Sequence, residues 1–221
     1  NILEKIVNVT KIENKNILEV GPGTGNLTSF ILKNNPKKLF VIEKDNELAK
    51  NLNINFGEKL TVINDDILSI NENLLFNEKV TVFGNLPYNI STQLIFKLFE
   101  VLGSVEDMHF MLQLEVVQRL TASPGDRAWG RLAILAQYHC EVKHLFNVPP
   151  NAFKPIPKVQ SAVVRLTPLK RKTCEDIDSC ALSNATRLAF SKRRKTLRNN
   201  LKSVIDVDRL KDIEINPEAR A

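Results

Sequence analysis

The sequence has few of the residues on which disulfide and metal chemistry depend. It contains only three cysteines and three histidines among 221 residues. The cysteines form an odd number without C-x-x-C spacing, which argues against a disulfide framework and against a zinc site. The histidines show no H-x-x-x-H spacing, which argues against a metal hydrolase. We therefore expect no metal, and roles in packing or at the surface for Cys140, Cys174, Cys180, His109, His139 and His144.

Long apolar runs are also missing. No stretch approaches the roughly 20 apolar residues that span a bilayer, and residues 1–5 lack the layout of a signal peptide. We therefore expect a cytoplasmic protein, and a chain of this length that is 43% hydrophobic can bury one full core. The first residue, Asn1, already lies in a helical pattern, so we expect an upstream segment to have been lost or omitted.

Charge is distributed unevenly along the chain. The net charge is +6. Between Arg165 and Lys202 there are eleven Lys and Arg against three acids, an excess of eight positive charges, so the rest of the chain carries −2. We call the segment from Arg165 to Lys202 the basic rear and the nearly neutral part before it the front. This distribution predicts a catalytic domain joined to a surface that binds a polyanion.

The front of the chain alternates short β-rich runs with helical stretches, a pattern typical of parallel strands joined by right-handed crossovers. The expected strands are 16–20, 38–43, 60–63, 80–83 and 108–112, and the expected helices are 26–34, 46–55, 91–101 and 115–122. Two later apolar runs, 139–148 and 161–166, are separated by a loop too short for a helical crossover, which predicts an antiparallel pair. The sequence thus predicts an α/β domain over 1–167 and a small, basic, helical domain over 168–221, joined near Lys170-Arg171-Lys172.

A glycine-rich loop follows the first expected strand. It reads Glu19-Val20-Gly21-Pro22-Gly23-Thr24-Gly25, and glycines at such a strand-to-helix turn let backbone N–H groups approach a ligand closely. A dinucleotide fingerprint would require glycine at position 26, where the sequence has asparagine. The G-x-G-x-G pattern is instead similar to the first motif of S-adenosylmethionine-dependent methyltransferases. In the alternative interpretation the glycines only shape the turn.

Acidic residues follow the next two strands. Glu43 ends the second, where a carboxylate can accept hydrogen bonds from both hydroxyls of a ribose. Asp66 follows the third and is placed to accept from the adenine amine of the same cofactor. Either acid could instead cap a helix or face water. Three such features at successive strand ends favour a ligand site, because open α/β sheets bind ligands there.

The stretch Asn85-Leu86-Pro87-Tyr88 follows the fourth expected strand. The exocyclic amine of adenine is a poor nucleophile, because its lone pair is delocalised into the ring. Two acceptors, Asn85 Oδ1 and the Leu86 carbonyl, would pull that nitrogen toward tetrahedral geometry and free the lone pair for attack on a sulfonium methyl. Pro87 holds its φ at about −65° and adds no donor, and Tyr88 offers a ring face for stacking. The alternative is an ordinary strand-to-helix turn.

A second aromatic ring is expected because a target base must be unpaired and held by stacking. Phe153 lies on the proline-rich loop between the last two expected strands, in the stretch Asn151-Ala152-Phe153-Lys154-Pro155. Base stacking is the interpretation we favour for Phe153, because functional residues are common on loops. It could instead plug the core.

Three motifs together resemble a known family. They are Asn85-Leu86-Pro87-Tyr88-Asn89-Ile90-Ser91, Phe153-Lys154-Pro155 with Pro157-Lys158-Val159, and Phe190-Ser191-Lys192-Arg193-Arg194-Lys195-Thr196-Leu197-Arg198-Asn199. This set resembles the small-subunit rRNA adenine N6,N6-dimethyltransferases of the KsgA type over essentially the whole chain. The resemblance implies a Rossmann-like class I methyltransferase fold with a small C-terminal helical domain. It further implies S-adenosylmethionine as cofactor and a role in ribosome biogenesis.

The resemblance also implies a substrate and a set of site residues. The substrate would be two adjacent adenosines near the 3′ end of 16S rRNA in the small subunit. Family positions matching Gly21, Glu43, Asp66 and Asn85 contact the cofactor, and those matching Asn85, Leu86, Tyr88 and Phe153 form the target pocket. From the loop itself we add Gly23 and Gly25 to the expected cofactor site, and we add Pro87 to the expected catalytic residues. The family's N-terminal segment is absent before Asn1, and we expect its last helices to be cut short after Ala221.

The basic rear is predicted to contact RNA backbone. The residues expected to do so are Arg187, Arg193, Arg194, Lys195, Arg198 and Lys202. The spacing of Arg187, Arg194, Arg198 and Lys202 predicts one helix face, while Leu197, Leu201 and Val204 would line another. A solvated face is the alternative interpretation, but an excess of eight charges in so short a segment favours RNA.

Rival functions remain open at this point. A large-subunit (23S) rRNA adenine methyltransferase of the macrolide-resistance type would share fold and reaction, but the basic helical tail favours the small-subunit type. DNA N6-adenine methyltransferases usually carry an acid-Pro-Pro-aromatic motif, which Asn85-Leu86-Pro87-Tyr88 does not match. A mainly non-catalytic ribosome-assembly factor would use the same fold only to dock. A monomer is the simplest expectation for one active site per chain.

Overall fold

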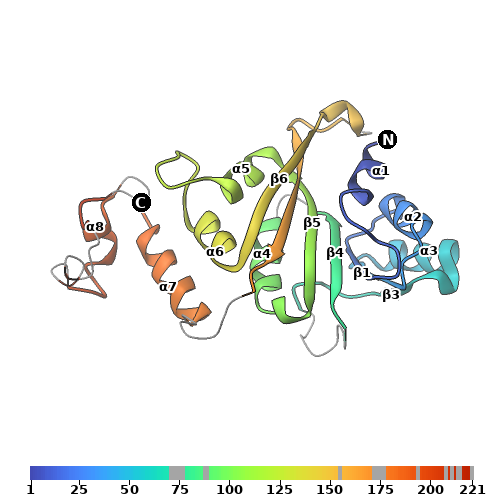
Figure 1. Ribbon diagram of the computed structural model, residues 1–221, viewed down its shortest axis with the longest axis horizontal. Helices are drawn as coiled ribbons and strands as arrows, with labels where there is room; N and C mark the ends of the chain where they lie inside the picture. Colours follow the sequence, from blue (N-terminus) through green and yellow to red (C-terminus); the bar gives the residue numbers. More distant parts are fainter. Residues whose placement is uncertain are drawn as a thin grey trace.

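The computed structural model describes residues 1–69, 78–86, 90–153, 156–170, 178–192, 195–206, 209, 212 and 216–219. Its centre is a seven-stranded sheet in the order β3-β2-β1-β4-β5-β7-β6 (Figure 1). The strands are β1 (Asn16–Val20), β2 (Lys38–Ile42), β3 (Thr61–Ile63), β4 (Val80–Asn85), β5 (Val105–Gln113), β6 (Cys140–Val148) and β7 (Ser161–Pro168). The five parallel strands of the front are those that the sequence predicts.

The last two strands form the antiparallel pair that the sequence predicts. β7 also pairs with β5, and it is antiparallel to that strand too, with Met108 opposite Leu166 and Gln113 opposite Ser161. β7 therefore lies between β5 and β6. This arrangement brings the loop that joins β6 to β7 to the same edge of the sheet as the carboxyl end of β5.

Helices cover both faces of the sheet. They are α1 (Ile2–Val7), α2 (Asn26–Lys33), α3 (Asn46–Phe56), α4 (Ser91–Phe99), α5 (Leu114–Thr121), α6 (Arg131–His139), α7 (Ser179–Ala189) and α8 (Leu197–Leu201). Short 3₁₀ turns among the described residues are η1 (Gly57–Lys59), η3 (Leu102–Ser104) and η4 (Pro150–Ala152). The local sequence sets these limits. At α3, for example, the Asp45 side chain accepts hydrogen bonds from the N–H groups of Glu47 and Leu48, and Gly57 ends the helix with a φ of 55°.

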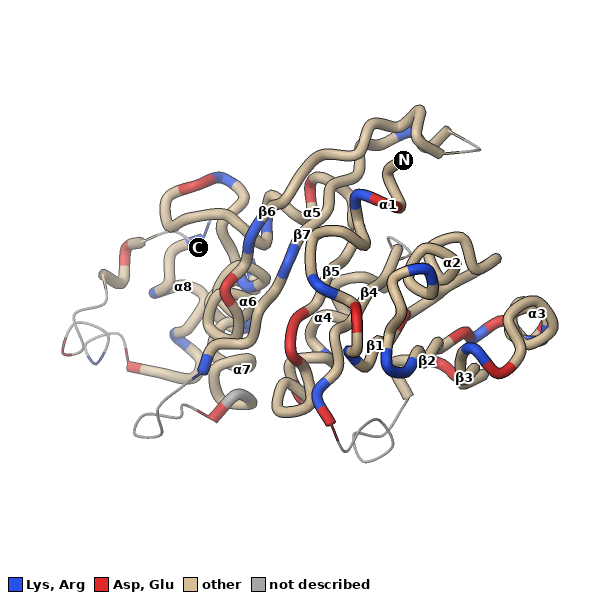
Figure 2. Tube along the Cα trace, turned by 45° about the vertical axis from the view of Figure 1, so that its right-hand side comes forward, with Lys and Arg blue, Asp and Glu red and all other residues tan. Residues whose placement is uncertain are grey.

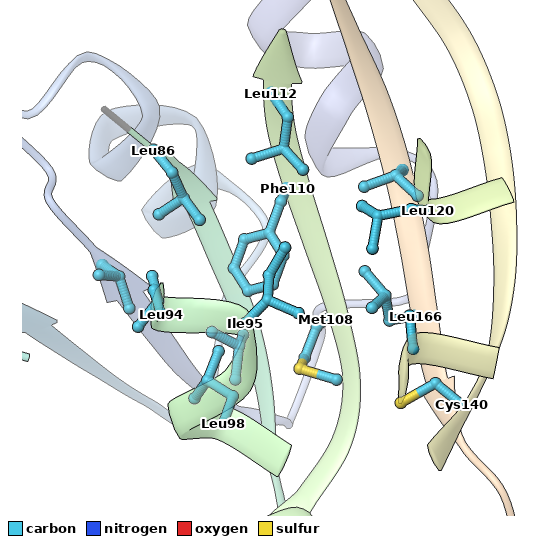
Figure 3. Packing of buried hydrophobic residues seen from close by; sticks show 14 of the residues in the cluster. Leu86, Leu94, Ile95, Leu98, Met108, Phe110, Leu112, Leu120, Cys140 and Leu166 are labelled. Atoms are coloured by element: carbon cyan, nitrogen blue, oxygen red, sulfur yellow. The ribbon is translucent and has the colours of Figure 1, made fainter. Parts of the chain in front are cut away.

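Alternation along the strands divides the core in two. On β5, Met108, Phe110 and Leu112 pack with α4, α5 and α6, whereas Met111 faces the cluster formed with α1, α2 and α3. Figure 3 shows the first cluster, with Phe110 between Leu86 of the β4 end and the side chains of α4. Full burial of each such side chain contributes about 1.5–3 kcal/mol. Because both faces are covered, these strands read in the sequence as nearly continuous apolar runs.

The basic rear differs from its prediction. It does not form one continuous helix, because α7 ends at Ala189 and α8 begins only after Thr196. The hydroxyl of Thr196 accepts a hydrogen bond from Asn199 N, which starts a new helix, and Asn200 Nδ2 donates to the Ala189 carbonyl at 2.6 Å, which holds α8 against the end of α7.

The prediction of a shared helix face is therefore wrong for Arg187, Arg198 and Lys202, and Arg194 lies outside the described residues. Arg187 is on α7, Arg198 is on α8, and Lys202 follows α8 as its C-cap. Val204 is 59% exposed, so it does not line an apolar face. A capping side chain interrupted the pattern that helical spacing alone suggested.

Candidate active site

Four candidate residues meet at one edge of the sheet. Gly21 follows β1, Glu43 follows β2, Asp66 follows β3, and Asn85 ends β4. These strands are parallel neighbours in the order β3-β2-β1-β4, so their carboxyl ends lie side by side. The structure thus brings together the residues that the sequence predicts for a cofactor and for chemistry.

The glycine loop has a backbone that only glycine adopts freely. Gly21, Gly23 and Gly25 have φ values of 63°, 58° and 82°. A Cβ atom added at Gly21 or Gly23 would meet no heavy atom of the described residues within 4 Å, whereas one at Gly25 would lie 2.6 Å from Cε2 of Phe56. Gly21 and Gly23 therefore leave open space along the loop, and Gly25 permits close packing of α2 on α3.

Glu43 is fixed beside this loop. Its side chain is 8% exposed, Oε2 accepts a hydrogen bond from Gly23 N at 3.0 Å, and Oε1 accepts one from Asp45 N at 2.9 Å. Asn64 Nδ2 donates to the Glu43 carbonyl at 2.9 Å. A carboxylate has about four acceptor positions, so two remain for hydroxyl groups of a ligand.

Asp66 is held by a partner that sequence reasoning missed. Its Oδ2 forms an ion pair with Lys44 Nζ at 2.8 Å, and its Oδ1 accepts from Leu68 N at 3.0 Å. The hydrogen bond from Lys44 lowers the pKa of Asp66, so the carboxyl is ionised and acts only as an acceptor at neutral pH. Lys44 directly follows Glu43 in the sequence, but the sequence pattern does not indicate its contact with Asp66.

Glu19, the acid that leads the glycine loop, is buried. It is 2% exposed, and Thr28 Oγ1 of α2 donates to its Oε2 at 2.6 Å. Burial raises the pKa of Glu19 to about 7. This contact joins β1 to α2 directly beneath the loop, and the sequence analysis gave no role to Thr28.

The end of β4 presents Asn85 while burying its neighbours. Asn85 is exposed, Leu86 is 1% exposed in the main core cluster, and Leu86 N donates to the Met111 carbonyl at 3.3 Å. A Cβ added at Gly84 would lie 2.7 Å from Leu86 Cδ2, so Gly84 lets Leu86 fold back over the strand. The packing of Leu86, seen in Figure 3, fixes the backbone that carries Asn85. The predicted residues Pro87 and Tyr88 lie outside the described residues.

Phe153 follows the 3₁₀ turn η4 in the loop between β6 and β7. It is half-buried and packs against the core cluster that contains Val148 and Val163. These contacts agree with the alternative interpretation, in which the ring of Phe153 packs into the core. Stacking of this ring on a base stays a prediction.

The predicted RNA contacts lie on or near α7 and α8. Arg187, Lys195, Arg198 and Lys202 are exposed, and Arg198 forms an ion pair with Glu218. Arg193 and Arg194 lie outside the described residues. Exposed cations in this region are available to phosphates, although Arg198 would first have to leave its carboxylate partner.

His109 and Cys140 are buried in the core, whereas His144 and Cys180 are exposed. His109 is buried with its Nε2 2.9 Å from Asp107 Oδ2, and Thr81 donates to Asp107 Oδ1 at 2.7 Å. Burial raises the pKa of the Cys140 thiol to about 12, which keeps it unreactive. Within the part of the chain that the structure describes, no three His, Cys, Asp or Glu side chains gather as a metal site requires, and no helix is long and apolar enough to cross a membrane.

The fold and this edge of the sheet define a class. A seven-stranded sheet with an antiparallel strand between β5 and β6, and with a glycine loop after β1 and an acid after β2, is the class I S-adenosylmethionine-dependent methyltransferase fold. The prediction of this fold is confirmed. A dimethyladenosine transferase from Plasmodium falciparum matches with a TM-score of 0.80 at 28% identity, covering 99% of this chain and 89% of that one.

Sequence comparison narrows the class to a family. The family model described as ribosomal RNA adenine dimethylase matches residues 1–221, and the chain belongs to this family. Ribosomal RNA small subunit methyltransferase A of Pseudomonas aeruginosa is 48% identical over 94% of this chain and 79% of its own length. Its counterpart from Shewanella sediminis is 46% identical over 100% and 84%. The 23S rRNA methyltransferase ErmE, with a TM-score of 0.74, 24% identity and coverage of 99% and 89%, shares the fold.

S-adenosylmethionine is the cofactor of this family, as the glycine loop predicts. The residues present fit it. Gly21 and Gly23 leave space along the loop, Glu43 keeps free acceptor positions for ribose hydroxyls, and ionised Asp66 can accept from an amine.

Proposed function

We propose that this rRNA adenine dimethyltransferase acts on two adjacent adenosines near the 3′ end of 16S rRNA in the small ribosomal subunit. Relatives 44–48% identical to this chain are named as small-subunit methyltransferases. The observation that carries the chemistry is the position of Asn85, exposed at the end of β4 and directly beside the strand that leads into the glycine loop.

The cofactor site of the proposal is formed by the ends of β1, β2 and β3. Bound S-adenosylmethionine supplies a methyl group on a positively charged sulfur, which is an excellent leaving group. Glu43 would accept from the ribose hydroxyls, and Asp66 from the adenine amine. The carboxylate of Glu43 is already oriented by Gly23 and Asp45, so little ordering is lost on binding.

The base pocket of the proposal is built on Asn85 and Leu86. Asn85 Oδ1 and the Leu86 carbonyl would accept hydrogen bonds from the two N–H groups of the adenine amine and so localise its lone pair. Burial of Leu86 supports this role, because it fixes the peptide that follows Asn85. Once the amine is held about 3 to 3.5 Å from the methyl carbon, positioning supplies much of the rate. As the new bond from nitrogen to the methyl carbon forms, the bond from sulfur to that carbon would break. The methylated nitrogen, now positively charged and acidic, would then lose its proton to water, so we assign no general base.

The remaining residues would hold the RNA. Tyr88 and Phe153 would stack on the unpaired base, and exposed cations near α7 and α8 would contact phosphates. Phe153 packs against the core but is only half-buried, so it keeps exposed surface for a base. We also propose that residues 168–221 form a separate RNA-binding domain, and that the protein acts as a monomer in the cytoplasm during ribosome biogenesis.

Incubation with two RNA substrates distinguishes the proposed function from methylation of 23S rRNA. The protein is incubated with labelled S-adenosylmethionine and either unmethylated small subunits or unmethylated 23S rRNA. The proposal predicts that label enters dimethyladenosine of 16S rRNA alone. Label in 23S rRNA alone would replace it with the large-subunit function, and binding without label in either RNA would favour a non-catalytic assembly factor.

A further inference from the structure

A hollow lined by lysines lies away from the proposed reaction. Its volume is about 550 Å³. Its lining includes Lys33, Lys37, Lys38 and Lys59, together with the apolar side chains of Leu39 and Phe56. Among the described residues that line it there is no aspartate or glutamate. We call this site the lysine hollow.

The fold gathers these lysines from segments that are far apart in the sequence. Lys33 is the last residue of α2, Lys38 is the first of β2, and Lys59 ends η1 just before β3. The hollow therefore lies at the amino ends of strands whose carboxyl ends hold the cofactor site. Because a strand rises by about 3.3 Å per residue, Lys38 and Glu43 are about 16 Å apart along β2.

The charges of the hollow are only partly compensated. Lys37 pairs with Glu78 at 2.7 Å, and the same carboxylate also interacts electrostatically with Lys38. No described carboxylate lies within ion-pair distance of Lys33, Lys38 or Lys59, and all three are exposed. A helix C-terminus favours a nearby cation, which accounts for Lys33 at the end of α2. It does not account for Lys38 and Lys59, which stand at the starts of neighbouring strands around the same hollow.

We propose that the lysine hollow binds phosphates of rRNA outside the strand that carries the target adenines. The inference rests on the proposed function in taking small-subunit rRNA as the partner. The hollow offers exposed ammonium groups rather than backbone N–H groups, since α2 and α3 both present their C-terminal ends there. Mobile ammonium groups suit a phosphate backbone, which needs charge and little directional recognition.

The position of the hollow indicates what a contact with rRNA would do there. Figure 2 shows α2 and the start of β2 on one side of the molecule and α7 and α8 on the other. Two basic regions on opposite sides can hold separate segments of one folded RNA, and the second contact then forms at a high effective concentration. Together they would fix the orientation of the sheet on the RNA, and with it the direction of the carboxyl edge, which lies at the opposite end of the strands from the hollow.

Two triple variants with the same net charge test the proposal. One carries Lys33→Gln, Lys38→Gln and Lys59→Gln. The control carries Lys11→Gln, Lys50→Gln and Lys97→Gln at three lysines that pair with acids outside the hollow. Binding to naked, unmethylated 16S rRNA is measured from about 50 to about 200 mM salt. Each lost phosphate contact lowers the log–log salt slope by about 0.9, so we expect a decrease of about 2 to 3 for the hollow variant and a smaller one for the control.

We further expect the hollow variant to bind naked rRNA about 10- to 100-fold more weakly at about 100 mM salt, with wild-type affinity for S-adenosylmethionine. Equal salt slopes for the two variants would overturn the proposal. Weaker binding to assembled subunits with unchanged binding to naked rRNA would also overturn it, in favour of an acidic protein partner. Because the readout is binding, loss of methylation in the wild type would count against the proposed function and not against the hollow.

Discussion

At the scale of single residues, the site depends on side chains whose partners are already in place. Glu43 accepts from Gly23 and Asp45, and Asp66 is held by Lys44. Such contacts fix acceptors before a ligand arrives, so binding requires little further ordering.

Removal of the Glu43 carboxylate should weaken cofactor binding. A hydrogen bond to a charged group contributes about 1.5–3 kcal/mol, so Glu43→Ala should raise the Kd of S-adenosylmethionine by about 10- to 100-fold. Isothermal titration calorimetry measures this value. Glu47→Ala is the matched control, because Glu47 is an exposed glutamate in the first turn of α3. An unchanged Kd for Glu43→Ala would remove Glu43 from the cofactor site.

The buried carboxyl of Glu19 predicts a pH dependence of stability. Its pKa is raised from 4.5 to about 7 on folding, so this group stabilises the folded state most below pH 4.5, and the contribution is lost as the pH rises toward 7. The loss is about 3 kcal/mol at most. Glu19→Gln cannot ionise and should therefore lose less stability than the wild type between about pH 5 and pH 8.

Urea unfolding of both proteins at the two pH values measures this difference. Asp66 and Asp107 have lowered pKa values and act in the opposite direction, but both proteins share them and their effect cancels. For Asp107, burial raises the pKa, and the hydrogen bonds of His109 and Thr81 outweigh it. The same pH dependence in wild type and variant would contradict a raised pKa at Glu19.

The candidate residues could be predicted from the sequence, but their partners could not. Gly21, Glu43, Asp66 and Asn85 stand at the carboxyl ends of the first four strands, and parallel strands place such residues at one edge wherever the helices lie. The contacts of Lys44 with Asp66, and of Thr28 with Glu19, depend on side-chain distances that no sequence pattern encodes. For Phe153 the sequence favoured the loop role, whereas its contacts are with the core.

At the scale of elements, the strand ends position the chemistry. β4 continues to Asn85, two residues beyond the predicted end, because Gly84 and Asn85 still pair with Phe110 and Met111 of β5. Apolar patterning predicted the buried middle of this strand but could not detect a terminal glycine and asparagine that pair through the backbone alone.

Gly84 should tolerate no larger side chain. In Gly84→Ala the new Cβ would lie 2.7 Å from Leu86 Cδ2 and 3.3 Å from Phe110 Cδ1, so we expect a loss of about 1–3 kcal/mol in unfolding free energy and reduced methylation. Urea unfolding and a methylation assay measure the two effects. Gly103→Ala is the control, because no described heavy atom lies within 4 Å of its added Cβ. Equal unfolding free energies for Gly84→Ala and Gly103→Ala would show that the packing of Leu86 does not need the space beside Gly84.

Helical spacing predicted the helix boundaries less well in the basic rear than in the front. In α4 and α5 the apolar residues repeat at helical spacing and face a sheet, and both helices lie close to their predicted ranges. The rear segment has few buried side chains to fix one long helix. The cap at Thr196 and the bond from Asn200 to Ala189 set the element boundaries instead.

At the scale of the whole molecule, the proposed chemistry and the proposed RNA contacts lie in different places. The groups proposed to react lie at the carboxyl edge of the sheet, whereas exposed cations lie near α7 and α8 and around the lysine hollow. Loss of the reaction should therefore leave binding of the substrate intact.

The most direct test of the central claim is the methylation rate of Asn85→Ala on unmethylated small subunits, measured together with its affinity for them. The account predicts a rate at least about a hundredfold lower than wild type, as for loss of one preorganised polar group, with unchanged affinity. Asn51→Ala, at an exposed asparagine of α3, should match the wild type in both. A wild-type rate for Asn85→Ala would contradict the claim that this amide oxygen activates the adenine amine.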